Sequence, residues 1–372
     1  MAITITKQPT GRYPAFNDSY VQFTSTLPAN VRAEIQIFGG VFPEPFVIYP
    51  NPSGVYTFNF KEAVKALMEE YDFADVNGAT IGASDWGQSL LGITRDVNAD
   101  ITVYGITEAS ETTSISLEFF RGVKQIGESI FTNNAQILNY STNGIDFKLT
   151  YFEGYPFSFE LLDLTHSGTK DITVKNLNSG ETSAQIFTQF SGAFKIIIDK
   201  GSSNWTTTSF LPLTDTINRL EVYEDDVFKS NLQLKKVPSR CGVYLKWLNS
   251  DGGYSYWLFD EFYRDNINSR ITGEYATNRF ANLGDVVSPT GMLGKSASRT
   301  LRLKTEVDKN EEKILESLFT SPYVEMYSAR EPFQDGEWIS VQLNDNYSIS
   351  SKKSRNDVVV NVELPELNTI TR

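Results

Sequence analysis

Hydrophobic and polar positions alternate in short runs along most of the sequence, which is the pattern of half-buried strands. The clearest case is the stretch 241–262, where an alternating run that includes Trp247 ends at the pair Asp251-Gly252. Asp-Gly favours a tight hairpin turn, and residues 254–259 predict the returning strand. Because both arms are rich in aromatic residues, we expect both faces of this hairpin to be covered. Either an ordinary β domain covers both faces, or a core covers one face and a neighbouring chain covers the other.

Residues 1–128 predict a β-sandwich covered by one helix. Their short alternating runs are separated by turns rich in Gly, Pro and Asn. Asn59 is placed to cap a helix from Phe60 to about Glu70, where apolar residues recur at helical spacing. The expected strands are residues 2–5, 33–38, 46–49, 55–58, 100–105 and 113–120.

Residues 129–236 predict a second, smaller β-sandwich of the immunoglobulin-like kind. Short apolar runs are spaced here by clusters of Ser, Gly, Asn and Asp, which favours an all-β domain. The expected strands are residues 147–151, 157–162, 171–177, 184–189, 194–198, 219–223 and 231–237.

Residues 237–372 predict a third β domain that starts with the long hairpin. Asp308 and Glu311 have the spacing of a capping box, which predicts a helix that ends at Pro322. The expected strands are residues 300–307, 323–327, 337–343, 347–351 and 358–364. Residues 266–299 show little apolar periodicity, so we expect a long loop that is mobile in the isolated subunit and ordered in an assembly.

The composition supports a mainly β fold of several β-sandwich domains with one or two short covering helices. Aromatic residues make up 13% of the 372 residues. The net charge of −13 without a basic stripe argues against specific nucleic-acid binding, and a single Cys excludes an internal disulfide framework. Residues 1–16 lack the pattern of an export signal, and no window of about 18 apolar residues occurs. We therefore expect folding in a cytoplasm and no membrane partner.

Candidate catalytic groups are scarce. His166 is the single histidine and lies in an expected turn, without a nucleophile motif that it could serve. Cys241 is expected to be an inert, buried thiol. One His and one Cys cannot build an ordinary zinc site, and no phosphate-loop or dinucleotide motif is present. The sequence predicts that the protein is not an enzyme and has no catalytic, cofactor-binding or metal-binding residues.

Two features leave a glycan-related role open. The carboxylate runs 224–226 and 311–312 could flank a sugar as in a glycosidase, although such runs are usually solvated faces. Trp205, in the polar loop 201–208, either contacts a glycan or folds back onto its sandwich. The hairpin turn, with Asn249-Ser250-Asp251-Gly252, matches only part of a calcium-binding loop.

The hairpin sequence YLKWLN at 244–249 followed by GGYSYWLF at 252–259 resembles a hairpin of virion structural proteins. These proteins belong to phages and prophages of the Bacteroides–Flavobacterium group. Three other pieces look similar and follow in the same order: Arg121-Gly122-Val123, Leu149-Thr150-Tyr151 and Ser321-Pro322-Tyr323-Val324. The resemblance extends over most of the chain and is weakest in its first segment.

The resemblance implies a role in assembly and brings no catalytic residues with it. It implies a tail protein of the virion, at the distal end, in the baseplate or in a connector ring, made in the host cytoplasm. The order of elements in 237–372 also looks like the tube-type domain of tail tube and distal tail proteins. We expect a homo-oligomeric ring, sixfold or threefold, that contacts other tail proteins through the hairpin 241–262 and the sheet at 337–364. The alternative is a carbohydrate-binding or glycan-degrading surface protein.

Overall fold

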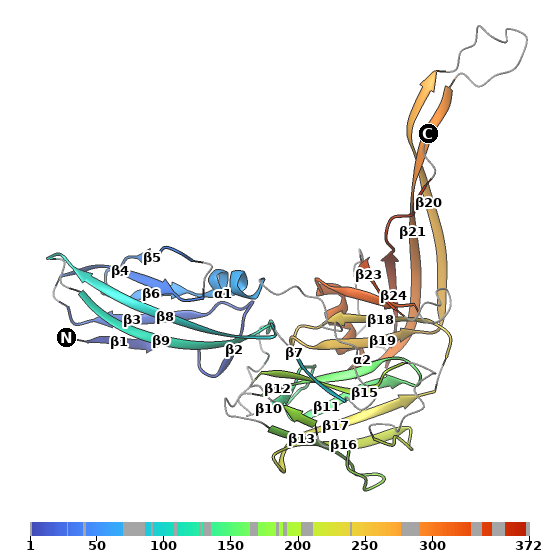
Figure 1. Ribbon diagram of the computed structural model, residues 1–372, viewed down its shortest axis with the longest axis horizontal. Coiled ribbons are helices and arrows are strands. Elements are labelled where there is room, and N and C mark those ends of the chain that lie inside the picture. Colours follow the sequence, from blue (N-terminus) through green and yellow to red (C-terminus); the bar gives the residue numbers. More distant parts are fainter. Residues whose placement is uncertain are drawn as a thin grey trace, which may run out of the picture. The chain divides into compact units, whose positions relative to one another are not determined.

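The computed structural model describes most of the chain, which divides into two compact units. The described residues are 2–27, 29–39, 42–69, 86–90, 92–107, 110–125, 128, 135–163, 170–183, 186–188, 192–201, 211–238, 240–276, 290–328, 337–343 and 354–369. The first unit comprises Met1–Val237 with Asn249–Ser255, and the second comprises Pro238–Leu248 with Tyr256–Arg372. The predicted mainly β class is confirmed, since the described strands form five sheets and the helices are short (Figure 1).

The first part of the first unit is a β-sandwich with one helix, as predicted. One sheet has the order β1 (Ile3–Lys7), β3 (Tyr20–Ser25) and β6 (Tyr56–Asn59). The other has the order β2 (Arg12–Pro14), β9 (Ser110–Phe120), β8 (Thr94–Gly105), β4 (Asn30–Ile37) and β5 (Phe46–Ile48).

The helix α1 (Lys61–Met68) buries the apolar face that its spacing predicts. Val64, Leu67 and Met68 join a core cluster with buried residues of both sheets, so the helix closes this core. Phe60 is the N-cap and has no capping side chain, but the Asn59 side chain accepts a hydrogen bond from the Lys61 amide at 3.1 Å. Asn59 therefore caps the helix from one position earlier than the usual N-cap.

The second part of the first unit has two further sheets. One has the order β10 (Ala135–Ile137), β12 (Phe157–Asp163), β15 (Ala193–Asp199) and β7 (Gly87–Leu90). The other has the order β11 (Asp146–Phe152), β17 (Val227–Val237), β16 (Ile217–Glu224), β13 (Lys170–Asn176) and β14 (Ile186–Thr188). Strand β7 comes from the predicted first domain but pairs with β15, so the boundary expected near residue 128 does not separate the two sandwiches cleanly.

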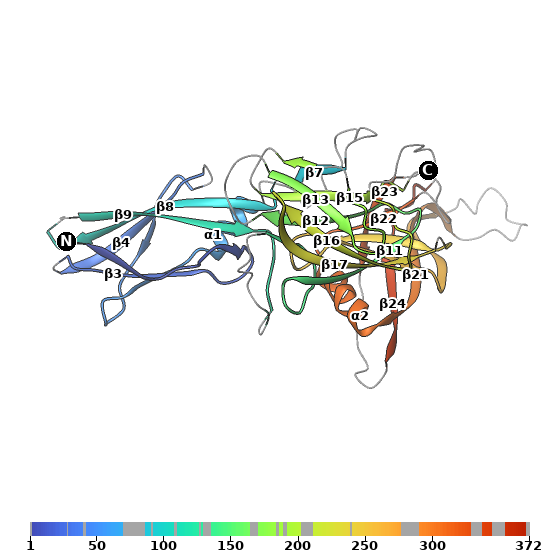
Figure 2. The same cartoon turned by 90° about the horizontal axis from the view of Figure 1, so that it is seen from below.

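The second unit is built on one seven-stranded sheet. Its order is β19 (Tyr254–Phe259), β18 (Val243–Leu248), β22 (Val324–Tyr327), β23 (Trp338–Leu343), β24 (Arg355–Glu363), β21 (Thr290–Asp308) and β20 (Phe262–Ala276). The helix α2 (Lys309–Glu316) and the 3-10 turn η2 (Ser317–Thr320) follow β21, and α2 packs beside β24 (Figure 2).

The predicted capping box is confirmed at the start of α2. Asp308 accepts hydrogen bonds from the amides of Asn310 and Glu311, and the Glu311 side chain accepts one from the Asp308 amide. Asp308 is extended, so its carboxylate reaches the free amides of the first turn.

The two strands of the central hairpin are buried throughout. Every residue of β18 and β19 is buried within the single chain. Trp247 donates a hydrogen bond to Ser317 and Trp257 donates one to Thr305, so both indole N–H groups are satisfied inside the second unit. The interpretation of a central hairpin in an ordinary β domain is confirmed for these strands, and their aromatic residues do not need a neighbouring chain to cover them.

The prediction of a long loop at residues 266–299 is wrong. Its described parts belong to β20 and β21, which pair from Phe262 with Lys304 to Ala276 with Thr290. Apolar periodicity is weak here because the chain buries neither face of this ribbon for most of its length, so no face had to be apolar. Residues 277–289 lie outside the described part.

We expect Trp257→Ala to destabilise the second unit by about 3–5 kcal/mol, because it opens a large cavity and leaves Thr305 without its indole partner. Thermal unfolding would measure the loss. Tyr49→Ala is the matched control, since Tyr49 is 72% exposed and its removal leaves no cavity. An unchanged melting temperature for Trp257→Ala would contradict the placement of this side chain in the core.

Candidate functional site

The structure describes only some of the candidate catalytic and binding residues that were named from the sequence. His166 and Trp205 lie outside the described residues, so the glycan contact through the Trp205 loop stays a prediction. Cys241 was expected to be buried and is exposed. The reason is its position: β18 begins only at Val243, so Cys241 precedes the strand that enters the core.

The expectation of a solvated face holds for only part of the run 224–226, because Asp225 and Asp226 are exposed and Glu224 is buried. Glu224 is 3% exposed and forms an ion pair with Lys229, whose Nζ lies 2.8 Å from Oε2 of Glu224. Asp225 and Asp226 have positive φ and make the tight turn between β16 and β17. The three acids therefore lie in one hairpin, Glu224 in an ion pair and the other two in its turn.

The run 311–312 is also largely buried. Glu311 serves the capping box, and Glu312 accepts a hydrogen bond of 3.0 Å from the side-chain nitrogen Nδ2 of Asn356 in β24. The sequence predicted the capping role of Glu311 but not the partners of Glu224 and Glu312, because only the fold brings those residues together. Within the described ranges, no group of three or more His, Cys, Asp or Glu side chains is placed to hold a metal ion. No described helix is both long enough and apolar enough to cross a bilayer.

The turn of the central hairpin is held by buried polar contacts in the first unit. The Asn249 side chain accepts hydrogen bonds from the amides of Asp251 and Gly253, and its own amide group donates to the carbonyl of Leu138 at 3.0 Å. These contacts fold the turn on itself and attach it to the chain beside β10.

Two buried acids fix the same turn. Asp251 forms an ion pair with Lys124, and the side chains of these two residues are 5% and 9% exposed. Glu160 in β12 is 1% exposed and accepts a hydrogen bond of 2.8 Å from the Tyr254 amide. Both carboxylates thus lose water and gain a specific partner.

Burial raises the pKa of the Asp251 carboxyl, and the nearby Lys124 ammonium opposes part of that rise. A raised pKa means that the folded chain binds this proton more tightly than the unfolded chain. The contribution of Asp251 to stability therefore declines as pH rises above about 4, the ordinary value of an Asp carboxyl.

One piece of the virion-protein resemblance lies directly against this turn. The Val123 amide donates a hydrogen bond of 2.7 Å to the carbonyl of Ser250. Gly252 has a φ of 88°, and a Cβ added there would overlap the carbonyl oxygen of Arg121. Only glycine suits this position, because the backbone is left-handed and the approach is close. The Arg121-Gly122-Val123 piece and the hairpin turn are therefore parts of one packed feature.

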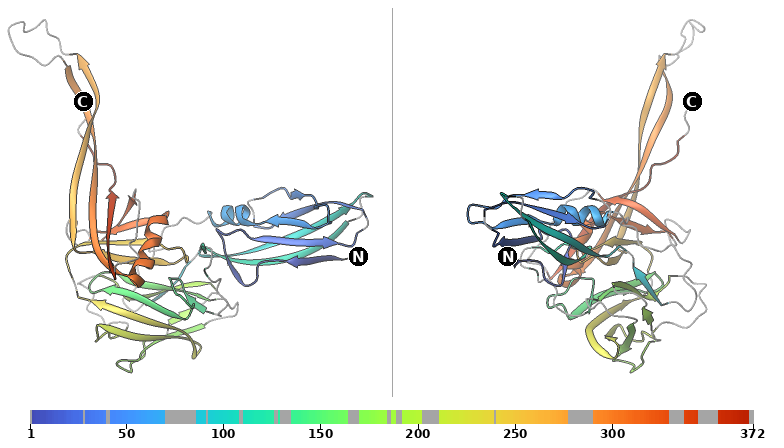
Figure 3. Two further views of the ribbon diagram at one scale, coloured as in Figure 1. Left: turned by 180° about the vertical axis from the view of Figure 1, so that it is seen from behind. Right: turned by 60° about the vertical axis from the view of Figure 1, so that its left-hand side comes forward.

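The most exposed structure of the second unit is the ribbon formed by 262–276 and 290–299, which we call the arm. It projects past the rest of its sheet, as both views of Figure 3 show. β24 pairs with β21 only from Thr300 to Asp308, and the segment 364–369 adds a few bonds to β21 as far out as Lys295. Among the described strands, β20 has a neighbour on one side only.

One face of the arm carries an apolar row. Tyr263, Ile267 and Ile271 stand four residues apart and so share a face, and they are 37%, 65% and 44% exposed. Leu303, which pairs with Tyr263, is fully buried. The core face of the sheet thus continues outward onto the arm, where these exposed apolar side chains share the face with the ion pair of Asp265 and Arg299.

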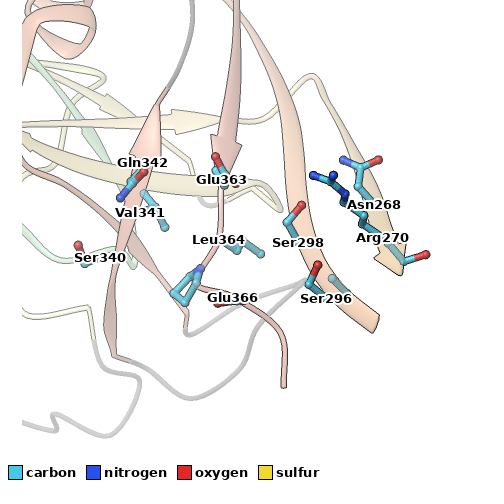
Figure 4. A pocket seen from close by; sticks show the side chains of 13 residues that line it. Asn268, Arg270, Ser296, Ser298, Ser340, Val341, Gln342, Glu363, Leu364 and Glu366 are labelled. Atoms are coloured by element: carbon cyan, nitrogen blue, oxygen red, sulfur yellow. The ribbon is translucent and has the colours of Figure 1, made fainter. Parts of the chain in front are cut away.

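The opposite face of the arm is polar and basic. Of the six Lys or Arg in 263–276 and 290–304, Arg264, Arg270, Arg302 and Lys304 lie on this face, whereas Lys295 and Arg299 pair with Ile271 and Ile267 on the other. Arg264 and Arg302 are exposed and lie directly opposite each other in the ladder. At the foot of the arm this face borders a groove of about 680 Å³. The groove is lined from β20 and β21 on one side and from β23 and the end of β24 on the other, including Asn268, Arg270, Ser298, Gln342 and Glu363 (Figure 4).

Comparison with known proteins gives no family for this chain. No protein-family model matches the sequence, and no curated protein matches it significantly. A tetra-tandem repeat from the extending region of a large adhesion protein aligns with 96% of this chain and 65% of its own, at 9% identity and a TM-score of 0.23.

A bacterial ice-binding adhesin aligns with 93% of this chain and 90% of its own, at 9% identity and a TM-score of 0.19. Dimeric latent PorU from Porphyromonas gingivalis aligns with 63% of this chain but only 20% of its own, at 8% identity and a TM-score of 0.17. Similarity this low supports no conclusion about function.

We expect Lys124→Met to lower the free energy of unfolding by about 3–5 kcal/mol at a pH where Asp251 is ionised, because it leaves the Asp251 carboxylate buried without a counter-ion. The double variant Lys124→Met/Asp251→Asn should recover much of that loss, since it removes both charges. Urea unfolding of the wild type, both single variants and the double variant gives the coupling energy. Arg355 and Glu306 form the control pair, because both are exposed and their coupling should stay below about 1 kcal/mol. A coupling energy below about 1 kcal/mol between Lys124 and Asp251 would contradict the buried ion pair.

Proposed function

We propose that this protein is a structural assembly subunit that works by packing against other protein chains. The observation that carries the proposal is the arm, with its exposed apolar row and the open edge of β20. An isolated two-stranded ribbon is marginally stable in water, and an open apolar edge promotes aggregation. Contact with a partner chain would stabilise the ribbon and cover its open edge.

The specific assembly that we propose is the tail of a bacteriophage, with the subunit at the distal end, in the baseplate or in a connector ring. The sequence resemblance to virion proteins of Bacteroides–Flavobacterium phages and prophages supports this role, as does the resemblance of residues 237–372 to a tube-type domain. The protein would be made in the host cytoplasm and reside in the virion. Tail genes beside its gene would support the proposal without any assay.

In the tail, we propose a closed ring of copies, sixfold or threefold, that also contacts other tail proteins. A ring requires two different patches on each subunit, one for each neighbour. The exposed face of the arm that carries Tyr263, Ile267 and Ile271 supplies one patch, which is distinct from the edge of β20. The exposed parts of β23 and β24 at 337–364 supply a candidate for the other, whereas the strands of the hairpin 241–262 are buried and offer little surface.

The proposed role includes no catalytic step, so purified protein should not turn over polysaccharides, peptides or esters. Glu224 is committed to its ion pair with Lys229, which leaves it poorly placed as an acid or base. A panel of such substrates would measure this. Turnover that disappears in Glu224→Gln or Asp226→Asn would establish an enzyme and overturn the proposal.

Ile267→Asp should weaken self-assembly at least tenfold without lowering the melting temperature, because Ile267 is 65% exposed and lies on the arm. Native mass spectrometry and sedimentation would measure the assembly. Ile106→Asp is the matched control, since Ile106 is 73% exposed in the first unit. A wild-type chain that stays monomeric at all concentrations, and that is absent from purified virions, would contradict the proposed function.

A further inference from the structure

Three pairs of residues in β20 are complementary about Ser269. Reading outward from Ser269, Ile271 mirrors Ile267, Glu274 mirrors Arg264 with the opposite charge, and Tyr275 mirrors Tyr263. Such symmetry is what an antiparallel strand needs to pair with a copy of itself, because each residue then meets its mirror position. We propose that β20 pairs with β20 of a second copy of this chain around a two-fold axis at Ser269.

The geometry of β20 suits this pairing. β20 is the last strand in the sheet order, so its outer edge is the side on which a further strand can add. Its register with β21 is locally irregular between Ile271 and Glu274 but is the same on both sides of that irregularity. The spacing of residues along the strand is therefore kept from Tyr263 to Tyr275.

The apolar residues gain the most from the contact. Ile267 of each copy would lie opposite Ile271 of the other, next to the axis on both sides. These side chains are 65% and 44% exposed in the single chain. Tyr263 and Tyr275, at 37% and 38%, would meet at the two ends of the paired strands. Cross-strand aliphatic and aromatic pairs of this kind stabilise antiparallel sheets.

The charges of the arm favour the same register. Arg264 faces Arg302 within the arm, and like charges directly opposite each other are unfavourable. Among the described residues, no ion pair involves Arg264 or Glu274. In the proposed register Glu274 of the second copy lies beside Arg264, twice per dimer by symmetry, and offsets the repulsion from Arg302. A register shifted to centre on Ile267 would instead place Arg264 opposite Arg270.

This contact goes beyond the proposed function, because a two-fold contact is distinct from the contacts that close a ring. It would join the seven-stranded sheets of two copies into one continuous sheet. In a tail it could link two rings back to back or pair subunits before assembly, and it would exist equally in a protein with another role.

Cysteine cross-linking of the full-length chain tests the axis directly. In a Cys241→Ser background, Ser269→Cys should form a disulfide-linked dimer rapidly under mild oxidation, because the two residues at position 269 meet at the axis. Asn266→Cys is the control on the same strand and is equally exposed, but its two copies would stand far apart. Cross-linking of Ser269→Cys no faster than that of Asn266→Cys would overturn the proposal.

A charge swap tests the register. Arg264→Glu alone and Glu274→Arg alone should each weaken the dimer about tenfold, because each creates two like-charge contacts across the axis. The double variant Arg264→Glu/Glu274→Arg should restore wild-type affinity in sedimentation equilibrium. Melting temperatures of all three variants would verify that they fold. Additive weakening in the double variant would refute this register.

The two proposals fail separately. A ring or a virion location without Ser269→Cys cross-linking would leave the proposed function standing and remove the β20 contact. Specific cross-linking with charge-swap rescue in a protein absent from virions would support the β20 contact and contradict the proposed function.

Discussion

The buried contacts at the turn of the central hairpin fix where the seven-stranded sheet begins. The carboxylate of Asp251 is buried and pairs with Lys124. The carboxylate of Glu160 is buried and accepts a hydrogen bond from the Tyr254 amide. Such pairs add little net stability compared with apolar packing, but a wrong alignment would leave a buried charge unpaired. The turn belongs to the first unit, and its alignment is fixed by residues of that unit.

Burial differs between the two ends of the seven-stranded sheet. β18 is buried at every position, β24 alternates between buried and accessible positions, and the described side chains of β20 are almost all exposed. The chain completes one end of its sheet internally and leaves the other end open. An exposed terminal strand with an apolar row is the feature of this protein that is best suited to contact another chain.

The charge distribution adds to this picture. The chain as a whole is acidic, with a net charge of −13, while the arm and its foot are basic. A basic arm on an acidic chain is attracted to other copies of the same chain and repelled by cationic partners. β20 itself has two Arg, one Asp and one Glu and so no net charge, and in the proposed two-fold contact Arg264 meets Glu274 of the second copy.

The sequence by itself determined the local features: the β class, most strands, the hairpin turn at Asp251-Gly252 and the capping box at Asp308. These follow from residue spacing and turn chemistry, which act over a few residues. The tertiary structure alone decided which side chains have partners. Glu224, Glu312 and Asp251 are buried because other segments bring Lys229, Asn356 and Lys124 to them. The arm was missed for the same reason, since a ribbon exposed on both faces has no apolar period and reads as a loop until its partner strand is seen.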